Sequence, residues 1–211
     1  MSKYITNLVR SFKLGEGAPT LMVDEAKSLK FSAPAIVTAT MAAPTPGGPI
    51  GVISRILDDA TGIDGYFEAI QEQMPQRQAQ LQELADKCTS LRMRLVKVHR
   101  DAEYAGSNPP KVLVRNFIRA KRGHLDELIS VIEGFIDDIP SGRTKPAFTE
   151  STTGRYGLVT ISIPYENAAA AEEGYDWVRS AAGTPRAKRM SDITEDSVRV
   201  PFQILHSDVQ M

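Results

Sequence analysis

The sequence predicts an α+β protein organised around one long antiparallel helical hairpin, coiled-coil-like in its packing and flanked by small β regions from the N- and C-terminal segments. Apolar residues recur at alternating steps of three and four between Phe67 and Ala102, and the spacing returns between Val114 and Ile139. A glycine- and proline-rich segment, 106–110, separates the two stretches. Heptad spacing is typical of the seam between packed helices, and a short connection makes those helices antiparallel neighbours.

The composition is that of an ordinary globular protein. The 211 residues carry a formal net charge of −1 and suit one domain, or a compact body with an extension. The single cysteine excludes an internal disulfide, and Cys88 is expected as a small buried side chain on the seam. No apolar run approaches the roughly 18 residues of a membrane-spanning helix, and the first residues lack the apolar core of a signal peptide. We therefore expect a cytoplasmic protein, found in the virion if it is viral.

The N-terminal segment, 1–48, is predicted to combine a short helix with short strands and a linker. Residues 4–14 place their apolar side chains on one helical face, which packs on the body of the protein or, alternatively, lies on a membrane surface. Residues 42–48 contain two prolines and two glycines and are predicted to be the linker. The predicted strands of this segment are 20–23, 29–32 and, with the clearest alternation, 35–41.

The central segment, 49–140, is predicted to hold the hairpin after a short helix at 50–60. The first long helix spans 76–105, which is about 45 Å at 1.5 Å per residue. Pro75 either kinks this helix or marks its start. The second long helix ends near Ile139, where a proline and a glycine follow.

The hairpin predicts specific contacts across its seam. Arg77 interrupts the apolar pattern, and an antiparallel register places it near Asp137 or Asp138 as a pair that sets the register. The side chains expected to be buried between the helices are Leu84, Leu91, Leu95, Leu128 and Ile132.

The C-terminal segment, 141–211, is predicted to form a β-α-β unit with polar loops at 142–153 and 183–196. No internal repeat is found in the sequence. The N- and C-terminal strands form either one sheet or separate pieces that pair with other subunits. The predicted elements are a strand at 155–163, a helix at 166–182 containing the only tryptophan, Trp177, and a strand at 198–205.

Charge is distributed unevenly along the predicted hairpin. Between Leu91 and His124 there are nine basic residues and two acidic ones, whereas acids dominate both distal halves. A basic tip of this kind binds nucleic acid or anionic lipid, meets an acidic neighbour in an assembly, or simply solvates an exposed surface. The candidate polyanion-binding residues are Arg94, Lys97, Arg100, Lys111, Arg115, Arg119 and Arg122.

Catalytic motifs are missing from the sequence. It has no nucleophile elbow and no Walker motif, and its three histidines lack the spacing of metal ligands. We therefore expect no cofactor, no metal and no small-molecule substrate, and no enzymatic activity.

These observations predict a self-assembling, non-enzymatic structural subunit. The concrete forms are a virus coat, matrix or phage particle protein, present as a homo-oligomer, whose capsid or particle contacts use the hairpin. The alternative is a cytoplasmic adaptor that binds RNA or a partner helix through the same hairpin.

Overall fold

The computed structural model describes residues 2–15, 19–41, 48–180 and 182–209. These residues form two compact units: unit 1 holds those up to Lys97 together with those from Phe202 onwards, and unit 2 holds those from Val98 to Pro201. The sequence instead predicted three segments, 1–48, 49–140 and 141–211, whose boundaries differ from those of the two units. The division into three segments stays a prediction.

Unit 1 is an antiparallel sheet with two helices on one face. Its order in the chain is strand, helix, strand, strand, helix, strand, and its strands lie side by side as β4-β1-β3-β2, followed by the last part of β8. Leu8 lies opposite Ile53 on one side and Met93 on the other, in antiparallel registers. The elements are β1 (Tyr4–Phe12), α1 (Leu21–Ser28), β2 (Ala35–Thr40), β3 (Ile50–Leu57), α2 (Thr61–Lys87) and β4 (Cys88–Arg100).

Unit 2 repeats the same succession. Its strands lie in the order β8-β5-β7-β6, which matches β4-β1-β3-β2 of unit 1 position by position. Both units therefore have the βαββαβ topology of ferredoxin-like folds. The second helix of the repeat is one long helix in unit 1 and two shorter helices in unit 2. The elements are β5 (Val112–Ala120), α3 (Leu125–Asp137), β6 (Ala147–Ser151), β7 (Leu158–Tyr165), α4 (Ala168–Ser180), α5 (Pro185–Ile193) and β8 (Thr194–Ser207).

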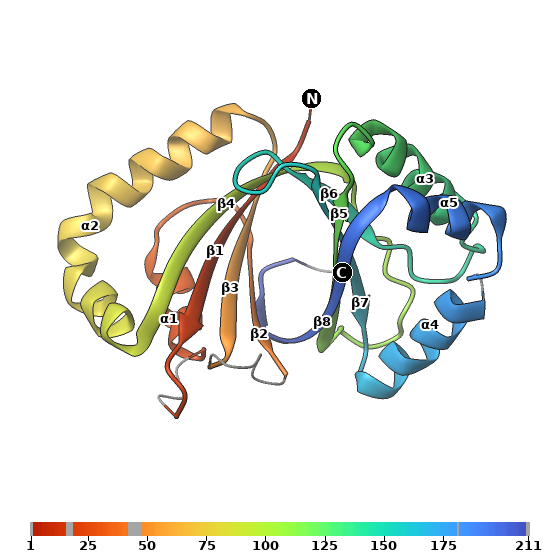
Figure 1. Cartoon of the computed structure of the whole chain (residues 1–211). Helices are drawn as coiled ribbons and strands as arrows, with labels where there is room; N and C mark the ends of the chain where they lie inside the picture. The colour runs from red at the N-terminus through yellow and green to blue at the C-terminus, as the bar shows by residue number, and fades with distance from the viewer. Residues whose placement is uncertain (1, 16–18, 42–47, 181, 210–211) are drawn as a thin grey trace. The chain divides into compact units, whose positions relative to one another are not determined.

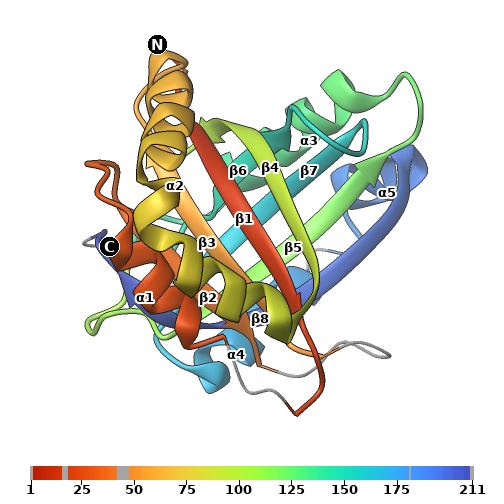
Figure 2. The same ribbon diagram turned by 90° about the vertical axis from the view of Figure 1, so that its left-hand side faces the viewer.

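Each unit has its own apolar core between the sheet and its helices. Figure 2 shows α1 and α2 crossing one face of the unit 1 sheet, where Phe12, Met22 and Leu84 are almost completely buried. In unit 2, α3, α4 and α5 lie on one face of the sheet (Figure 1). Leu128 and Ile132 follow each other at helical spacing and pack on that face. Burial of these faces is the main force that holds each helix on its sheet.

The predicted long helical hairpin is wrong. The first helix ends at Lys87, and Cys88–Arg100 is a strand. The second predicted helix begins with strand Val112–Ala120, and only Leu125–Asp137 is helical. The physical reason is that apolar residues four apart, such as Leu91 and Leu95, share one face in a strand as well as in a helix, and pairing with neighbouring strands decides between the two periods.

Several shorter elements were also predicted wrongly. Segment 4–14 is strand β1, 50–60 is strand β3, and 20–23 begins helix α1. No strand is found at 29–32, whereas the predicted loops contain β6 and α5. The linker predicted at 42–48 lies, except for its last residue, outside the described residues. The confirmed predictions are the strands near 35–41, 155–163 and 198–205 and the helix near 166–182.

Hydropathy adds one finding on membranes. Among the helices that the structure describes, none is both long and apolar enough to cross a bilayer.

Candidate functional site

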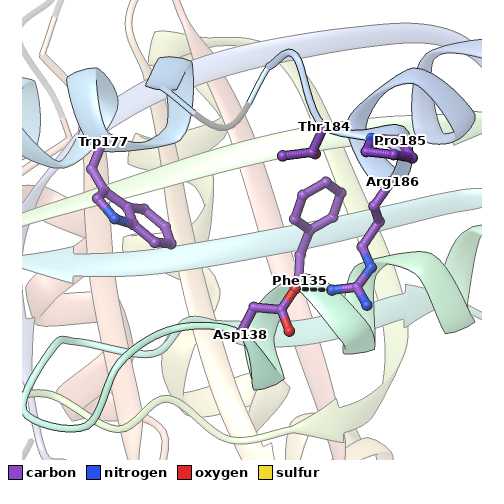
Figure 3. Close-up of a pocket in the computed structure, with 6 residues that line it drawn as sticks. All are labelled: Phe135, Asp138, Trp177, Thr184, Pro185 and Arg186. Carbon is purple, nitrogen blue, oxygen red and sulfur yellow. Dashed lines mark hydrogen bonds and ion pairs between the residues drawn. The ribbon is translucent and has the colours of Figure 1, made fainter.

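A cavity of about 460 Å³ opens among the three helices of unit 2. Residues of α3, α4 and the start of α5 line it. Figure 3 shows Phe135 projecting from α3 towards Thr184 and Pro185, with Trp177 on one side and Arg186 on the other. The pocket thus has two aromatic side chains in its lining and charged groups at one end.

The pocket exists where the second helix of the unit 2 repeat is interrupted. Thr184 has extended backbone angles, φ −70° and ψ 153°, because a residue that precedes proline is disfavoured in the helical region. Pro185 then starts α5, where a proline costs no hydrogen bond. The Thr184 hydroxyl accepts a hydrogen bond from the Ala187 N–H at 3.2 Å and caps the helix. In unit 1 the corresponding helix α2 is unbroken from Thr61 to Lys87.

Arg186 and Asp138 form the charged end of the pocket. The Arg186 guanidinium donates to the Gly134 carbonyl oxygen at 2.6 Å and to the Asp138 carboxylate. It also lies over the Phe135 ring, 5.6 Å from its centroid. Gly134 permits this close approach, since a Cβ at that position would come within 2.9 Å of the guanidinium carbon. The pocket therefore presents a cation whose charge is balanced by an adjacent carboxylate.

A second arginine lies over the ring of Trp177. The Arg143 guanidinium carbon lies 5.5 Å from the centroid of the Trp177 ring, a cation–π distance. Arg143 belongs to the turn that follows α3, where its N–H donates to the Pro140 carbonyl at 3.2 Å. Each aromatic side chain of the pocket is thus in contact with one guanidinium.

The helices that frame the pocket are tied together by a three-residue ionic cluster. Arg189 of α5 donates to the Glu127 carboxylate of α3 at 2.5 Å, and His124 lies 3.0 Å from the same carboxylate. The hydrogen bonds from His124 and Arg189 hold the pKa of Glu127 below its usual range. The carboxylate therefore links α3 and α5 over the whole neutral pH range.

Unit 1 has a buried ionic cluster in the space between its helices and its sheet. Arg10 of β1 and Glu25 of α1 form two hydrogen bonds, at 2.6 and 3.1 Å, and both side chains are 3% exposed. Arg77 of α2 donates to the Ser28 hydroxyl at 3.1 Å and to the Glu25 carbonyl at 3.2 Å. These contacts join α1 and α2 to the sheet, and we assign them a structural role.

The predicted partners of Arg77 were therefore wrong. Arg77 belongs to unit 1, where it binds α1. Asp137 and Asp138 belong to unit 2, where they pair with Arg100 and Arg186. The helical register that would have joined them does not exist.

The predicted polyanion-binding residues do not share a helical tip. They lie on strands and turns of both units, so the geometry from which they were predicted is wrong, while polyanion binding itself stays a prediction. Arg94 and Lys97 lie on β4 in unit 1, Arg100 ends β4 in unit 2, Lys111 precedes β5, Arg115 and Arg119 lie on β5, and Arg122 follows β5.

Two of these arginines have environments that disfavour contact with a polyanion. Arg115 is 8% exposed, and burial lowers its pKa to about 10. Arg119 pairs with Glu195 at 2.7 Å and Asp196 at 3.3 Å. Lys111 and Arg122 are exposed.

No combination of metal ligands stands out. Among the described residues, no three histidine, cysteine or acidic side chains gather closely enough to hold a metal ion.

Sequence reasoning missed this pocket, although parts of its signal were visible. Trp177 is the only tryptophan of the sequence, and Arg186 begins a run of basic residues within the predicted loop 183–196. The succession Gly183-Thr184-Pro185 is a helix-start signal that would have separated α4 from α5. The contact between Arg186 and Gly134 had no local signal, because 51 residues of chain lie between them.

Comparisons with known proteins show the fold. No protein-family model matches the chain, and no curated protein matches it. Solved structures do match over nearly the whole length. A protein of Fusobacterium nucleatum subsp. nucleatum, provisionally named a monooxygenase, has 11% identity and a TM-score of 0.64, and the match covers 98% of this chain and 94% of that one.

Two further solved structures share the fold. An anthrone oxidase-like protein has 13% identity and a TM-score of 0.64, with 98% of this chain and 92% of that one covered. A variant of chlorite dismutase from Candidatus Nitrospira defluvii has 12% identity and a TM-score of 0.58, with coverages of 96% and 90%. At such identities the likeness is one of fold.

These findings correct the functional predictions. The virus coat, matrix or phage particle subunit is wrong, as is the hairpin adaptor, because both need a helical rod that the chain does not form. The absence of enzymatic activity is contradicted as well, since the solved structures that share this fold are named after enzymes. The predicted virion location depended on the structural-protein prediction and has no support.

Proposed function

We propose that the chain is an enzyme that binds a planar aromatic molecule in the pocket of α3, α4 and α5 and oxidises it with molecular oxygen. The observation that carries this proposal is the pocket itself, a cavity of about 460 Å³ with Phe135 and Trp177 in its lining and the Arg186–Asp138 pair at one end. Aromatic rings bind one another in stacked or edge-on geometry, so a flat arene is the ligand that suits such a lining.

The names of the solved structures support the oxidative part of the proposal. One is provisionally named a monooxygenase and another is anthrone oxidase-like. Anthrone is a planar aromatic ketone, and one anthrone with one O2 gives one anthraquinone and one water. Two C–H bonds of the methylene carbon break, a C=O bond forms there, and the second oxygen atom leaves as water. The reaction balances without a further oxidant or reductant.

The polar residues of the pocket have roles in such a reaction. Asp138 is the carboxylate of the lining and would accept the proton that leaves the methylene carbon. Arg186 would stabilise the oxyanion that develops on the ketone oxygen, since a guanidinium donates strong hydrogen bonds to anionic oxygen. The Arg186 contact with Gly134 fixes the guanidinium in position before a ligand arrives.

Binding can be tested directly through the pocket's own fluorophore. Trp177 is the only tryptophan, so quenching of intrinsic fluorescence by dihydroxyanthrone or its quinone reports a ligand near the pocket. We expect saturable quenching, and Phe135→Ala should raise the dissociation constant about tenfold because a ring–ring contact and its buried area are lost. Phe67→Ala in α2 is the matched control, because Phe67 is a helical phenylalanine of unit 1 that is 43% exposed.

Turnover needs its own measurement. Oxygen uptake and quinone absorbance should rise together with anthrone as substrate, and Asp138→Asn should reduce both without changing the fluorescence titration greatly. If neither anthrone nor its quinone quenches Trp177, or if Phe67→Ala weakens binding as much as Phe135→Ala, the pocket is not the site. The predicted cytoplasmic location and homo-oligomeric state stay predictions.

A further inference from the structure

We propose that the ligand of this pocket is an aromatic acid, and that Arg143 determines the specificity by binding its carboxylate. The inference deepens the proposed function, because it concerns the same pocket and names the chemical class of the ligand. It depends on the different surroundings of the two arginines that contact the aromatic side chains.

The charge of Arg186 is already balanced. Its guanidinium is bonded to the Asp138 carboxylate and to the Gly134 carbonyl oxygen. A second anion placed there would meet the negative charge of Asp138. Arg186 therefore suits a neutral or partially charged oxygen, such as a ketone, better than a carboxylate.

Arg143 differs from Arg186 in this respect. Among the described residues, no carboxylate lies within ion-pair distance of its guanidinium, whose central carbon lies 5.5 Å from the centroid of the Trp177 ring. Its side chain is exposed, so it can change rotamer at little cost. A guanidinium that stands on an aromatic ring keeps its in-plane N–H donors free, and these match the two oxygens of a carboxylate.

The other charged groups near the pocket do not balance the positive charge of Arg143. Arg179 of α4 lies 3.9 Å from Asp176, and Arg189 of α5 pairs with Glu127. The N-terminus of α5, which Thr184 caps, adds a partial positive charge. Asp138, Arg143 and Arg186 together leave one positive charge beside the aromatic lining.

The inferred pose uses each of these groups once. The arene contacts Phe135 and Trp177 with its ketone oxygen towards Arg186, and its carboxylate extends to Arg143, which lies against the Trp177 ring and is not itself part of the lining. The expected ligand therefore carries one acidic group, at the end of the ring system away from the Arg186–Asp138 pair.

The test compares two isosteric probes on the full-length protein. Anthraquinone-2-carboxylate and anthraquinone-2-carboxamide have the same shape and differ by one negative charge. We expect the carboxylate to bind at least about tenfold more tightly by Trp177 quenching, with an advantage that shrinks between 50 and 500 mM salt because the charges are exposed. Calorimetry provides a second readout that does not depend on the fluorophore.

Two arginine variants test whether Arg143 causes the preference for the carboxylate probe. Arg143→Gln should abolish the difference between the two probes, because it weakens binding of the carboxylate far more than binding of the carboxamide. Arg179→Gln is the matched control, since Arg179 is likewise an exposed arginine over an aromatic ring, 5.9 Å from the Tyr175 centroid. That variant should keep the preference for the carboxylate.

The outcomes separate this inference from the proposed function. If both probes bind the wild type equally, or if Arg143→Gln keeps the preference, the aromatic-acid inference is wrong while arene binding stands. If neither probe binds by either readout, both the inference and the proposed pocket are wrong.

Discussion

Arg186 of α5 lies directly against Gly134 of α3, with its Nη1 2.6 Å from the Gly134 carbonyl oxygen. An added Cβ at Gly134 would come within 2.9 to 3.1 Å of three guanidinium atoms. The geometry of the charged end of the pocket therefore depends on the absence of a side chain at one helical position.

Gly134→Ala should affect stability and binding in opposite directions. Alanine favours a helix over glycine by about 1 kcal/mol, so the melting temperature should stay level or rise. The new methyl group should displace Arg186, and the affinity for an anthraquinone probe should fall. Gly65→Ala in α2 is the control, because its Cβ would meet only Phe31 at 3.9 Å. Unchanged binding in Gly134→Ala would show that Arg186 is not part of the site.

Removal of one partner from the buried ion pair of unit 1 should be costly. Glu25→Ala leaves the Arg10 guanidinium buried without its carboxylate, and such a change typically costs about 3–5 kcal/mol. Urea unfolding measures the loss. Glu83→Ala, which breaks the exposed Glu83–Lys87 pair, should cost no more than about 0.5 kcal/mol. Equal effects of the two changes would contradict a role of the buried pair in stability.

Leu84 and Leu91 occupy equivalent positions in the predicted heptad pattern, but their truncation should change the free energy of unfolding by different amounts. Leu84 is 1% exposed in the core of unit 1, whereas Leu91 on β4 is 55% exposed. Leu84→Ala should cost about 2–5 kcal/mol through lost burial and a residual cavity. Leu91→Ala should change the free energy of unfolding by less than about 0.5 kcal/mol. Thermal unfolding of both variants measures the two losses of stability. A large loss in Leu91→Ala would contradict the exposed position of Leu91 and support the predicted helical seam.

The ionic link between α3 and α5 should depend on pH. The pKa of Glu127 is held below its usual range by His124 and Arg189, so its contribution to stability is present above the ordinary value of about 4.3. That contribution is lost as the pH falls through the lowered pKa. The melting temperatures of the wild type and Glu127→Gln should therefore differ at pH 7 and 5, and the difference should disappear only as the pH falls below the lowered pKa of Glu127. Glu133→Gln, on the same helix, controls for the change in net charge.

The confirmed elements of the fold are those with a clear local signal. Strand β2 is rich in β-branched residues, and β7 follows a glycine and carries branched residues on one face. Helix α4 begins beyond Asn167, whose side chain accepts from the Ala170 N–H at 2.9 Å, and it is rich in alanine. Such signals act within a few residues, so they can be found without knowledge of the fold.

The strands Cys88–Arg100 and Val112–Ala120 had signals that fit two structures. Leu91 and Leu95 are spaced like helix neighbours, but Leu91, Met93 and Leu95 also alternate like one face of a strand. The choice was made by pairing with β1, in which Leu8 lies opposite Met93. Because that partner lies far away in the chain, no local window contains the hydrogen bonds that stabilise the strand.

The sequence by itself determined the helical capacity of Thr61–Lys87 and Leu125–Asp137, the strands near 35–41, 155–163 and 198–205, and the end of helix α4 before Pro185. Only the tertiary structure decided that two βαββαβ units form and that Arg186 rests on Gly134 beside Phe135 and Trp177. The reason is physical: helix caps and proline act on the adjacent backbone. Strand pairing and pocket contacts instead join residues that become neighbours only when the chain folds.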